Sequence, residues 1–505
     1  MSTIDVNIKN LIENIKNDVQ VDHNLYELKI ALGSLNSSQL SEGVAGVQLG
    51  FIFDCLNSSN RKQVLTTCDI LTLVLPIKPS QVTLSDYATP LVRALGHPFK
   101  EVKEMVLKEF NRGVGERELI TLLNSNVLNL IISCLCNEEI SVGTRAIEFL
   151  TKLGQTEDGL NVICQDMFVR QLIMQTSQSD VYKIRMYQVL VDISVHSPEG
   201  LGKIESCGLF GGLIDHLKSN DVLATMAALE VITPLVGTVH GYDFLVRNDI
   251  INLLAQQIAS FTDNPLASLV YPGLARFFGH IGREFPQRLV ALYPQVLKEV
   301  FKGVDSSDVN ISIVSLETIA FIAYSPPGKA ALYKQDERVM RHVMGKFQEA
   351  VTKLPTEWRV RALAALAHII HLSVDHITSD ITKVSLAWFN QLGPSALQNI
   401  FEMTRQPFPD IKAAAFNVLE KIAAHRWGQI KIINHPGLFE FLLDRSTETT
   451  LEGKQAKYDV IKTLYNSPTI SSTFEDEQCD RMAQYLQEGV IYVPFGNHVA
   501  VEGAD

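Results

Sequence analysis

One stretch of this 505-residue chain repeats itself, and the repeat restricts the possible folds more than any other feature. Within residues 139–258 an acidic residue followed by a β-branched apolar residue recurs every 41 residues, at Glu139-Ile140, Asp180-Val181 and Asp221-Val222. Twenty residues after each pair stands a glycine followed by an apolar residue, at Gly159-Leu160, Gly200-Leu201 and Gly241-Tyr242. The interval returns from Asp308 to Gly328 and nearly so from Asp410 to Gly428. A period near 40 residues is typical of stacked helical repeats.

One repeat unit, residues 180–217, shows what each period encodes. Asp180 can cap a first helix, because its carboxylate accepts hydrogen bonds from unpaired amides of the first turn. Apolar residues then recur at helical spacing, at Val181, Ile184, Tyr187, Val189, Leu190 and Ile193. Pro198 and Gly200 interrupt the pattern, and a second helix follows, which we expect Cys207-Gly208 to bend or divide. Neighbouring units must cover such a helix pair, which predicts an all-α, armadillo/HEAT-like α-solenoid of stacked helical repeats.

The regularity of the repeat divides the chain into four predicted segments. Residues 1–96 are expected to form N-terminal helical capping repeats, and residues 97–260 regular 41-residue armadillo-like repeats. Residues 261–445 are expected to form less regular HEAT/armadillo-like repeats, beginning with a turn at 261–265. Residues 446–505 are expected to form C-terminal helices and a tail, the tail at 495–505. At about 40 residues per unit, roughly eleven or twelve helix pairs fit into the chain.

Composition excludes several classes of protein. The net charge is −12 and the 44 basic residues form no dense block, so the footprint of a nucleic-acid-binding protein is missing. The seven cysteines are odd in number and scattered, which is typical of a reduced intracellular protein. The first ten residues contain no apolar core of a secretory signal, and apolar runs such as residues 70–76 are too short to span a bilayer. We therefore expect a cytoplasmic protein, also able to occur in the nucleus, that binds neither nucleic acid nor a membrane.

Motifs for catalysis are missing from the sequence. Gly328-Lys329 and Gly453-Lys454 lack the earlier glycine of a phosphate-binding loop, and there is no nucleophile elbow or metalloprotease motif. His368 and His371, with Asp375 and His376 beyond them, could converge on a metal ion, but a further fixed ligand is not apparent. Packing roles for these histidines are therefore expected, with no metal site, no cofactor and no enzymatic activity.

Certain short sequences in the second half carry a resemblance to a known family. They are Tyr271-Pro272-Gly273 with Arg276-Phe277-Phe278-Gly279, Gln406-Pro407-Phe408-Pro409, Pro436-Gly437 with Phe439-Glu440, Asp444-Arg445-Ser446-Thr447-Glu448, Ala456-Lys457-Tyr458, Tyr485-Leu486 with Glu488-Gly489, Tyr492-Val493, and Ala500-Val501-Glu502-Gly503-Ala504-Asp505. In their order and spacing the chain resembles the proteasome non-ATPase regulatory subunit 5 family, the assembly chaperones of the base of the 26S proteasome regulatory particle. The N-terminal 90 residues match only in being helical.

The resemblance implies a binding protein. It would contact the C-terminal domain of one proteasomal ATPase subunit, and hold that subunit with its ATPase neighbour and the large scaffold subunit of the base. It would leave before the mature proteasome forms, and would be monomeric when free. A curved array of repeats suits this role, because it offers an extended concave surface to a folded domain.

Candidate interface residues follow from the expectation that second helices line the concave side. The polar candidates on or beside such helices are Arg170, Asp215, Arg247, Arg283, Arg341 and Arg445. Phe278 and Trp427 could be exposed aromatic anchors, although Phe277-Phe278 beside Arg276, His280 and Arg283 are expected to be core residues more readily than an anchor patch.

The alternative function is a generic armadillo-like adaptor for protein–protein interaction. A nuclear-import receptor is a specific rival, and its groove uses tryptophans followed four residues later by asparagine on successive repeats. In this sequence the tryptophans at 358, 388 and 427 are followed at that offset by Ala362, Leu392 and Lys431. The missing ladder argues against import.

Overall fold

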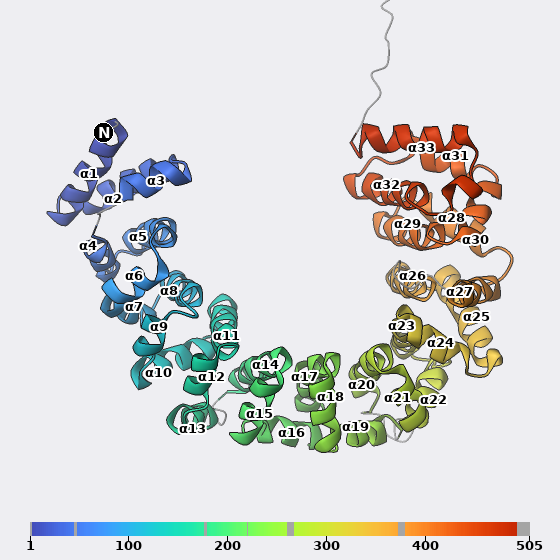
Figure 1. The fold of residues 1–505 in the computed structure, drawn as a ribbon, viewed down its shortest axis with the longest axis horizontal. Helices are drawn as coiled ribbons and strands as arrows, with labels where there is room; N and C mark the ends of the chain where they lie inside the picture. Colours follow the sequence, from blue (N-terminus) through green and yellow to red (C-terminus); the bar gives the residue numbers. More distant parts are fainter. Residues whose placement is uncertain are drawn as a thin grey trace, which may run out of the picture. The chain divides into compact units, whose positions relative to one another are not determined.

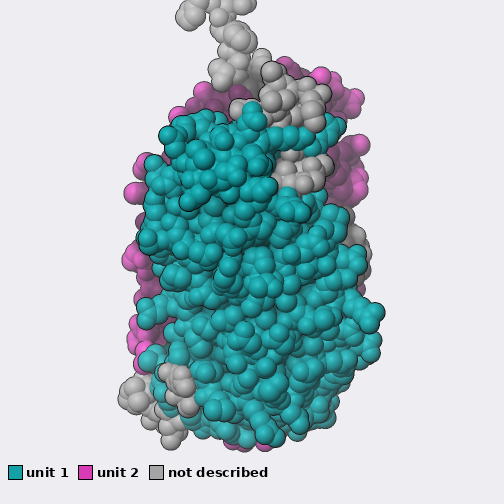
Figure 2. Space-filling model, turned by 90° about the vertical axis from the view of Figure 1, so that its left-hand side faces the viewer, with its two compact units in different colours: residues 1–248 teal, residues 249–505 magenta. Residues whose placement is uncertain are grey.

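The computed structural model describes residues 3–44, 48–175, 179–219, 221–259, 267–371 and 379–491. These residues form helices joined by short turns, with no strand among them. The chain divides into two compact units, residues 1–248 and 249–505, which are coloured separately in Figure 2. The predicted turn at 261–265 and tail at 495–505 lie outside the described residues, and the four predicted segments stay a prediction.

In unit 1, successive long helices pack on one another as a row, with the shorter helices on the other side (Figure 1). The row contains α2, α5, α8, α11, α14 and α17. The helices are α1 (Thr3–Lys16), α2 (Val21–Gly33), α3 (Ser37–Val44), α4 (Gly50–Asp54), η1 (Cys55–Asn57), α5 (Arg61–Val74), η2 (Leu75–Ile77), α6 (Ser80–Asp86), α7 (Ala88–Leu95), α8 (Lys100–Arg112), α9 (Arg117–Leu122), α10 (Ser125–Leu135), α11 (Ile140–Gly154), α12 (Glu157–Ile163), α13 (Asp166–Gln175), α14 (Asp180–His196), α15 (Pro198–Ser206), α16 (Gly211–Lys218), α17 (Val222–Ile232), η3 (Thr233–Gly237) and α18 (Val239–Arg247).

Unit 2 also contains such a row, formed by α20, α23, α26, α29 and α32, although α25 behind it is as long as the helices of the row. Its helices are α19 (Ile250–Ala259), α20 (Ala267–Glu284), α21 (Pro286–Leu292), α22 (Pro294–Gly303), α23 (Val309–Tyr324), α24 (Pro326–Tyr333), α25 (Glu337–Lys353), α26 (Thr356–Ile370), α27 (Ser379–Gln391), α28 (Ala396–Thr404), α29 (Pro409–Ala423), α30 (Arg426–Asn434), α31 (Leu438–Leu443), η6 (Arg445–Thr447), α32 (Leu451–Tyr465), η7 (Ile470–Ser472) and α33 (Asp476–Glu488). The predicted all-α solenoid is confirmed. By length and composition no single described helix could cross a membrane, and one bent pair, α23 with α24 at 115°, meets that criterion jointly.

The repeat at residues 180–217 follows the prediction in outline and departs from it in detail. The second helix is divided as expected, because α15 ends at Ser206 and Gly208 takes a left-handed φ of 71°. The cap of the first helix is Ser179, whose hydroxyl accepts from the amide of Tyr182, so the prediction of Asp180 as cap was wrong. Val181 is 55% exposed and not a core residue.

The recurrent glycine is part of a turn that links each long helix to the next short one. A serine or threonine three residues earlier caps the short helix, and its hydroxyl accepts from the glycine amide at 3.0–3.2 Å. The pairs are Thr156 with Gly159, Ser197 with Gly200, Thr238 with Gly241, and Ser325 with Gly328, while Thr450 and Gly453 make the same bond at the start of α32, a helix of the row. In the first four, a Cβ on the glycine would lie 2.0–2.9 Å from a carbonyl oxygen near the end of the preceding helix. The glycine therefore lies inside the second helix, and is needed for close approach and not as a helix breaker.

Candidate partner-binding groove

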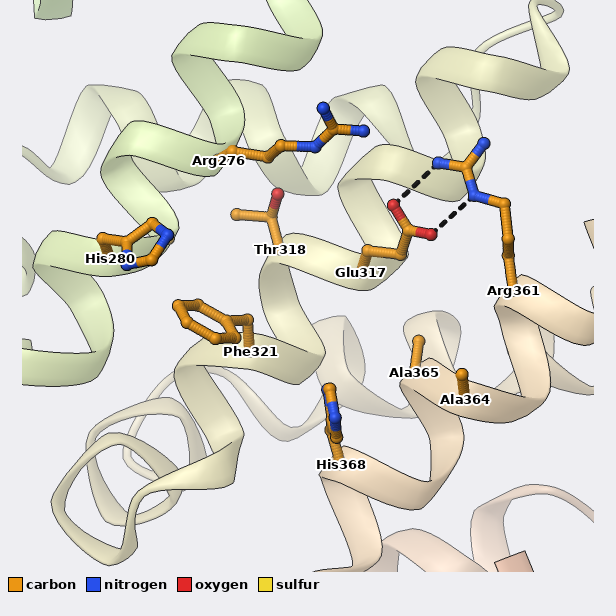
Figure 3. A pocket seen from close by; sticks show the side chains of 10 residues that line it. Arg276, His280, Glu317, Thr318, Phe321, Arg361, Ala364, Ala365 and His368 are labelled. Carbon is orange, nitrogen blue, oxygen red and sulfur yellow. Dashed lines mark hydrogen bonds and ion pairs between the residues drawn. The ribbon is translucent and has the colours of Figure 1, made fainter. Parts of the chain in front are cut away.

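A groove crosses three neighbouring helices of the row in unit 2, α20, α23 and α26 (Figure 3). Its volume is about 280 Å³. Gly279, Thr318 and Ala365 are buried around it, while Ala364 is exposed. The three helices pack closely here, since a Cβ on Gly279 would lie 3.3 Å from the Thr318 methyl group. Small side chains at this crossing leave room that larger ones would fill, and we name it the three-helix groove.

An ion pair between Arg361 and Glu317 forms one wall of the groove. Arg361 donates from Nε and Nη2 to the two carboxylate oxygens of Glu317, at 2.7 and 2.8 Å. Nη1 of Arg361 also donates to the Asn310 side chain at 3.4 Å, and its guanidinium lies 5.0 Å from the ring centre of Trp358. A two-pronged pair of this kind fixes orientation as well as charge. The pair therefore connects α23 to α26 and fixes how the two side chains face each other.

Aromatic and histidine rings form the lower end of the groove. The ring of Phe321 on α23 lies 4.7 Å from the ring of His280 on α20, and the guanidinium of Arg283 covers both Phe321 and Tyr324 at 4.7 and 4.8 Å. Burial lowers the pKa of His280, and the nearby Arg283 lowers it further. His280 is therefore neutral near pH 7.

The two histidines at the end of α26 pack against aromatic residues. His371 stacks on Tyr324 at 4.1 Å, and His368 meets the edge of the same ring at 5.3 Å. Partial burial is the main cause that lowers the pKa of both, to about 4 for His371, and the cations Lys421 and Arg283 add to it. Asp375 and His376, the other suggested metal ligands, lie outside the described residues. Within the described part of the chain, no three His, Cys, Asp or Glu side chains are placed to hold a metal ion.

Arg276 lies at the mouth of the groove. It extends from α20 toward α23 in Figure 3 and is exposed. Across the described ranges, no acidic side chain lies within ion-pair distance of its guanidinium. Glu317, the acidic residue that lines the groove, is instead paired with Arg361. The groove thus presents a cation with free hydrogen-bond donors beside an apolar floor.

A buried lysine anchors the end of α26, which carries part of the groove. Nζ of Lys329, on α24, donates to the carbonyl oxygens of Ile369 and, at 3.2 Å, of His371. These carbonyls belong to the last turn, where the helix itself provides no donor. Burial lowers the pKa of Lys329 to about 7.

We expect the free energy of unfolding to rise between pH 7 and 8.5 because of Lys329. In the unfolded chain this lysine keeps its proton up to about pH 10.4, whereas in the folded chain it loses the proton above pH 7, so the unfolded state binds more protons. The expected gain is about 1–2 kcal/mol. Denaturant unfolding at both pH values measures it, and Lys329→Met should remove this part of the rise. Parallel pH profiles for the two proteins would contradict the assignment.

The two suggested aromatic anchors are not on the surface. Phe278 is 1% exposed and packs edge-on against Phe277, and Trp427 is 8% exposed and packs against Phe389. Both rings face neighbouring helices because adjacent positions in a solenoid helix can each meet a different neighbour. The suggestion that Phe278 and Trp427 are exposed anchors was therefore wrong, and both are core residues.

The suggested polar residues are divided between the two sides of the array. Arg283 lies on α20 and borders the three-helix groove. Four others are exposed on helices behind the rows, Arg170 on α13, Asp215 on α16, Arg247 on α18 and Arg341 on α25. Arg247 pairs with Glu205 at 3.1 Å, and Arg341 with Glu337 at 2.6 Å. The row consists of the predicted first helices, whereas these four candidates lie on predicted second helices.

Arg445 has a structural role. Its guanidinium donates to the carbonyl oxygens of Tyr485 and Gly489 at 2.5 and 2.8 Å, pairs with Glu488 at 3.3 Å, and covers the Tyr485 ring. It therefore ties the end of α33 to the turn after α31.

The row in unit 1 exposes apolar side chains at the start of three successive helices. Ile140 on α11 is 77% exposed, Val181 on α14 is 55% exposed, and Leu223 on α17 is 78% exposed. These positions belong to the acidic–apolar pairs that mark the repeat, or adjoin them. The repeat thus marks exposed apolar side chains at helix starts, whereas apolar periodicity alone predicts that such side chains are buried in the core.

Comparisons with known proteins agree on one family. The sequence model described as "Proteasome non-ATPase 26S subunit" matches residues 4–505. The chain is 31% identical to a Bos taurus protein and 30% identical to a Homo sapiens protein, each named 26S proteasome non-ATPase regulatory subunit 5. Both matches cover 95% of this chain and 96% of the relative. A Drosophila melanogaster protein of the same name is 24% identical over 89% of each chain.

Among solved structures, the chain is similar to one in a Kap95:Nup1 complex. The TM-score is 0.58 at 12% identity, and the similarity covers 92% of this chain and 56% of the other. At this identity the likeness concerns the helical-repeat fold alone.

Proposed function

The chain belongs to the proteasome non-ATPase 26S subunit family, and on that basis we propose that it is an assembly chaperone for the base of the 26S regulatory particle. It binds the C-terminal domain of one proteasomal ATPase subunit, together with the neighbouring ATPase and the large scaffold subunit. It is released before the mature proteasome forms. We place this activity in the cytoplasm, and also in the nucleus, and assign the protein a binding role with no catalysis.

The observation that best supports a binding role is the chemistry of the rows of long helices. In unit 1 the row exposes Ile140, Val181 and Leu223, side chains that would gain by being covered. In unit 2 the row carries the three-helix groove with its exposed Arg276. Apolar surface and arginine side chains are both common in protein interfaces.

A row of helices suits the temporary masking of a partner surface. An interface of ordinary size buries about 800 Å² on each partner and involves roughly 20–30 residues a side. One helix cannot provide that area, but several neighbouring helices of a row can, because each repeat places an exposed strip beside the next. A folded domain held in this way is blocked by area and shape, with no chemical step.

The proposal is tested by incubating the full-length protein with the purified C-terminal domain of each of the six proteasomal ATPases. We expect one of them to be retained by the immobilised protein and the others to be retained weakly or not at all. Circular dichroism of each domain checks that it is folded. If well-folded domains all fail to bind, the chaperone function is wrong and a generic adaptor function becomes the better account.

A further inference from the structure

The three-helix groove has a positive local charge in a chain whose net charge is −12. Its guanidinium groups are those of Arg276, Arg283 and Arg361. Arg361 is paired with Glu317, and Arg283 has Glu284 at 3.6 Å, while Arg276 has no acidic partner among the described residues. Of these three guanidinium groups, that of Arg276 therefore has its charge and its donors available to a partner.

Burial is the main cause that lowers the pKa of the histidines lining the groove, and nearby charges act in both directions, since Glu284 raises the pKa of His280 and Glu317 that of His368. Arg283 lowers the pKa of His280, and Arg283 and Lys421 lower the pKa of His368, in each case after the larger effect of burial. With neutral imidazoles, the charge of the groove rests on its guanidinium groups at neutral pH. Electrostatic complementarity then favours an anionic occupant over a cationic one.

The size and the lining of the groove restrict that occupant further. A volume of about 280 Å³ accepts side chains and not a folded segment. Phe321, Ala364 and Ala365 present apolar surface, while Arg276 presents donors at the mouth. A carboxylate matches the planar donors of arginine in geometry and charge.

We propose that the three-helix groove binds an Asp or Glu side chain of the ATPase C-terminal domain, with an adjacent apolar side chain against Phe321 and Ala365. Arg276 pairs with the carboxylate. The Arg361–Glu317 pair forms one wall of the groove and holds α23 against α26. This assignment rests on the proposed function, because the proposed function supplies the partner, the ATPase C-terminal domain.

The test measures the dissociation constant between this protein and the ATPase domain retained in the binding experiment. Arg276→Glu should weaken binding about tenfold or more at low salt, and Arg276→Ala by less. The wild-type complex should weaken as salt is added, and the Arg276→Ala complex should do so less steeply. Thermal unfolding should be unchanged in both variants, because Arg276 has no ion pair to lose in the described structure.

Arg338→Glu is the matched control. Arg338 is exposed on α25, behind the row, and the substitution makes the same change in charge. Its effect on the dissociation constant should be less than about twofold, since an exposed charge away from the bound side chain is screened by salt.

A charge exchange identifies the occupant. Among single Asp→Arg and Glu→Arg variants of the ATPase domain, one should bind the wild-type protein weakly and the Arg276→Glu protein more tightly. Unchanged binding by Arg276→Glu, or the lack of any restoring partner variant, would overturn the carboxylate assignment while leaving the proposed function standing. Failure of the wild-type protein to bind all six domains would instead overturn the proposed function.

Discussion

Replacing Gly328 by alanine should destabilise the protein by about 2–4 kcal/mol. Gly328 is the third residue of α24, and its amide donates to the hydroxyl of Ser325 at 3.2 Å. A Cβ at this position would lie 2.0 Å from the carbonyl oxygen of Ile322, a backbone atom that cannot move without disturbing the end of α23. Because α23 carries Glu317 and Phe321, the shift should also disturb the three-helix groove. Denaturant unfolding measures the loss.

Gly345→Ala is the control for this prediction. Gly345 lies inside α25, and no atom lies within 4 Å of a Cβ built on it. Alanine is a better helix former than glycine, so this substitution should stabilise the protein by about 0.5–1 kcal/mol. The same Gly→Ala substitution should thus lower the free energy of unfolding at position 328 and raise it at position 345. If both variants are stabilised, close approach does not explain the recurrent glycine.

Lys412→Ala should cost about 3–5 kcal/mol, because it leaves a buried carboxylate without its charged partner. Nζ of Lys412 on α29 lies 2.7 Å from Oε2 of Glu448, whose side chain is 3% exposed. Glu448 follows η6, and it lines two open pockets of about 910 and 690 Å³. Chemical denaturation of the variant and the wild-type protein gives the difference.

Removing both charges separates the ion pair from simple packing. Lys412→Met with Glu448→Gln removes both charges of this pair, so the double variant should recover part of the loss seen in Lys412→Ala. The recovery is partial because Lys457, which is buried nearby, loses the favourable charge of Glu448. A double variant as unstable as the single one would show that the aliphatic part of Lys412, and not its charge, stabilises the protein.

The repeat predicted the architecture because each period encodes the same neighbours. The 41-residue interval locates α11, α14 and α17, and the break at Gly208 divides the second helix as expected. The spacing could also have located the groove, because Arg276 and Glu317 are 41 residues apart and Glu317 and Arg361 are 44 apart. The regular repeats were predicted to end at residue 260, so the sequence analysis did not relate these three residues to one another.

The period does not show which helix of a repeat faces a partner. Arg170, Asp215 and Arg341 were selected on helices that lie behind the rows, because the order of helices alone does not distinguish the two sides. Val181 continues the apolar pattern of α14 and yet is exposed, while the next residue, Tyr182, is buried. Burial at such positions depends on the packing of adjacent repeats, which the pattern of one helix does not contain.

The most direct test of the chaperone account is the distribution of the protein among proteasome assemblies in cells. Cell extracts are separated by native electrophoresis and probed for this protein, for the ATPases and for the 20S core particle. The account predicts that the protein migrates with incomplete base particles that contain ATPases, and is missing from complete 26S particles that contain the core. Equal amounts of the protein and the ATPases in complete 26S proteasomes would contradict it, and would make the chain a permanent subunit.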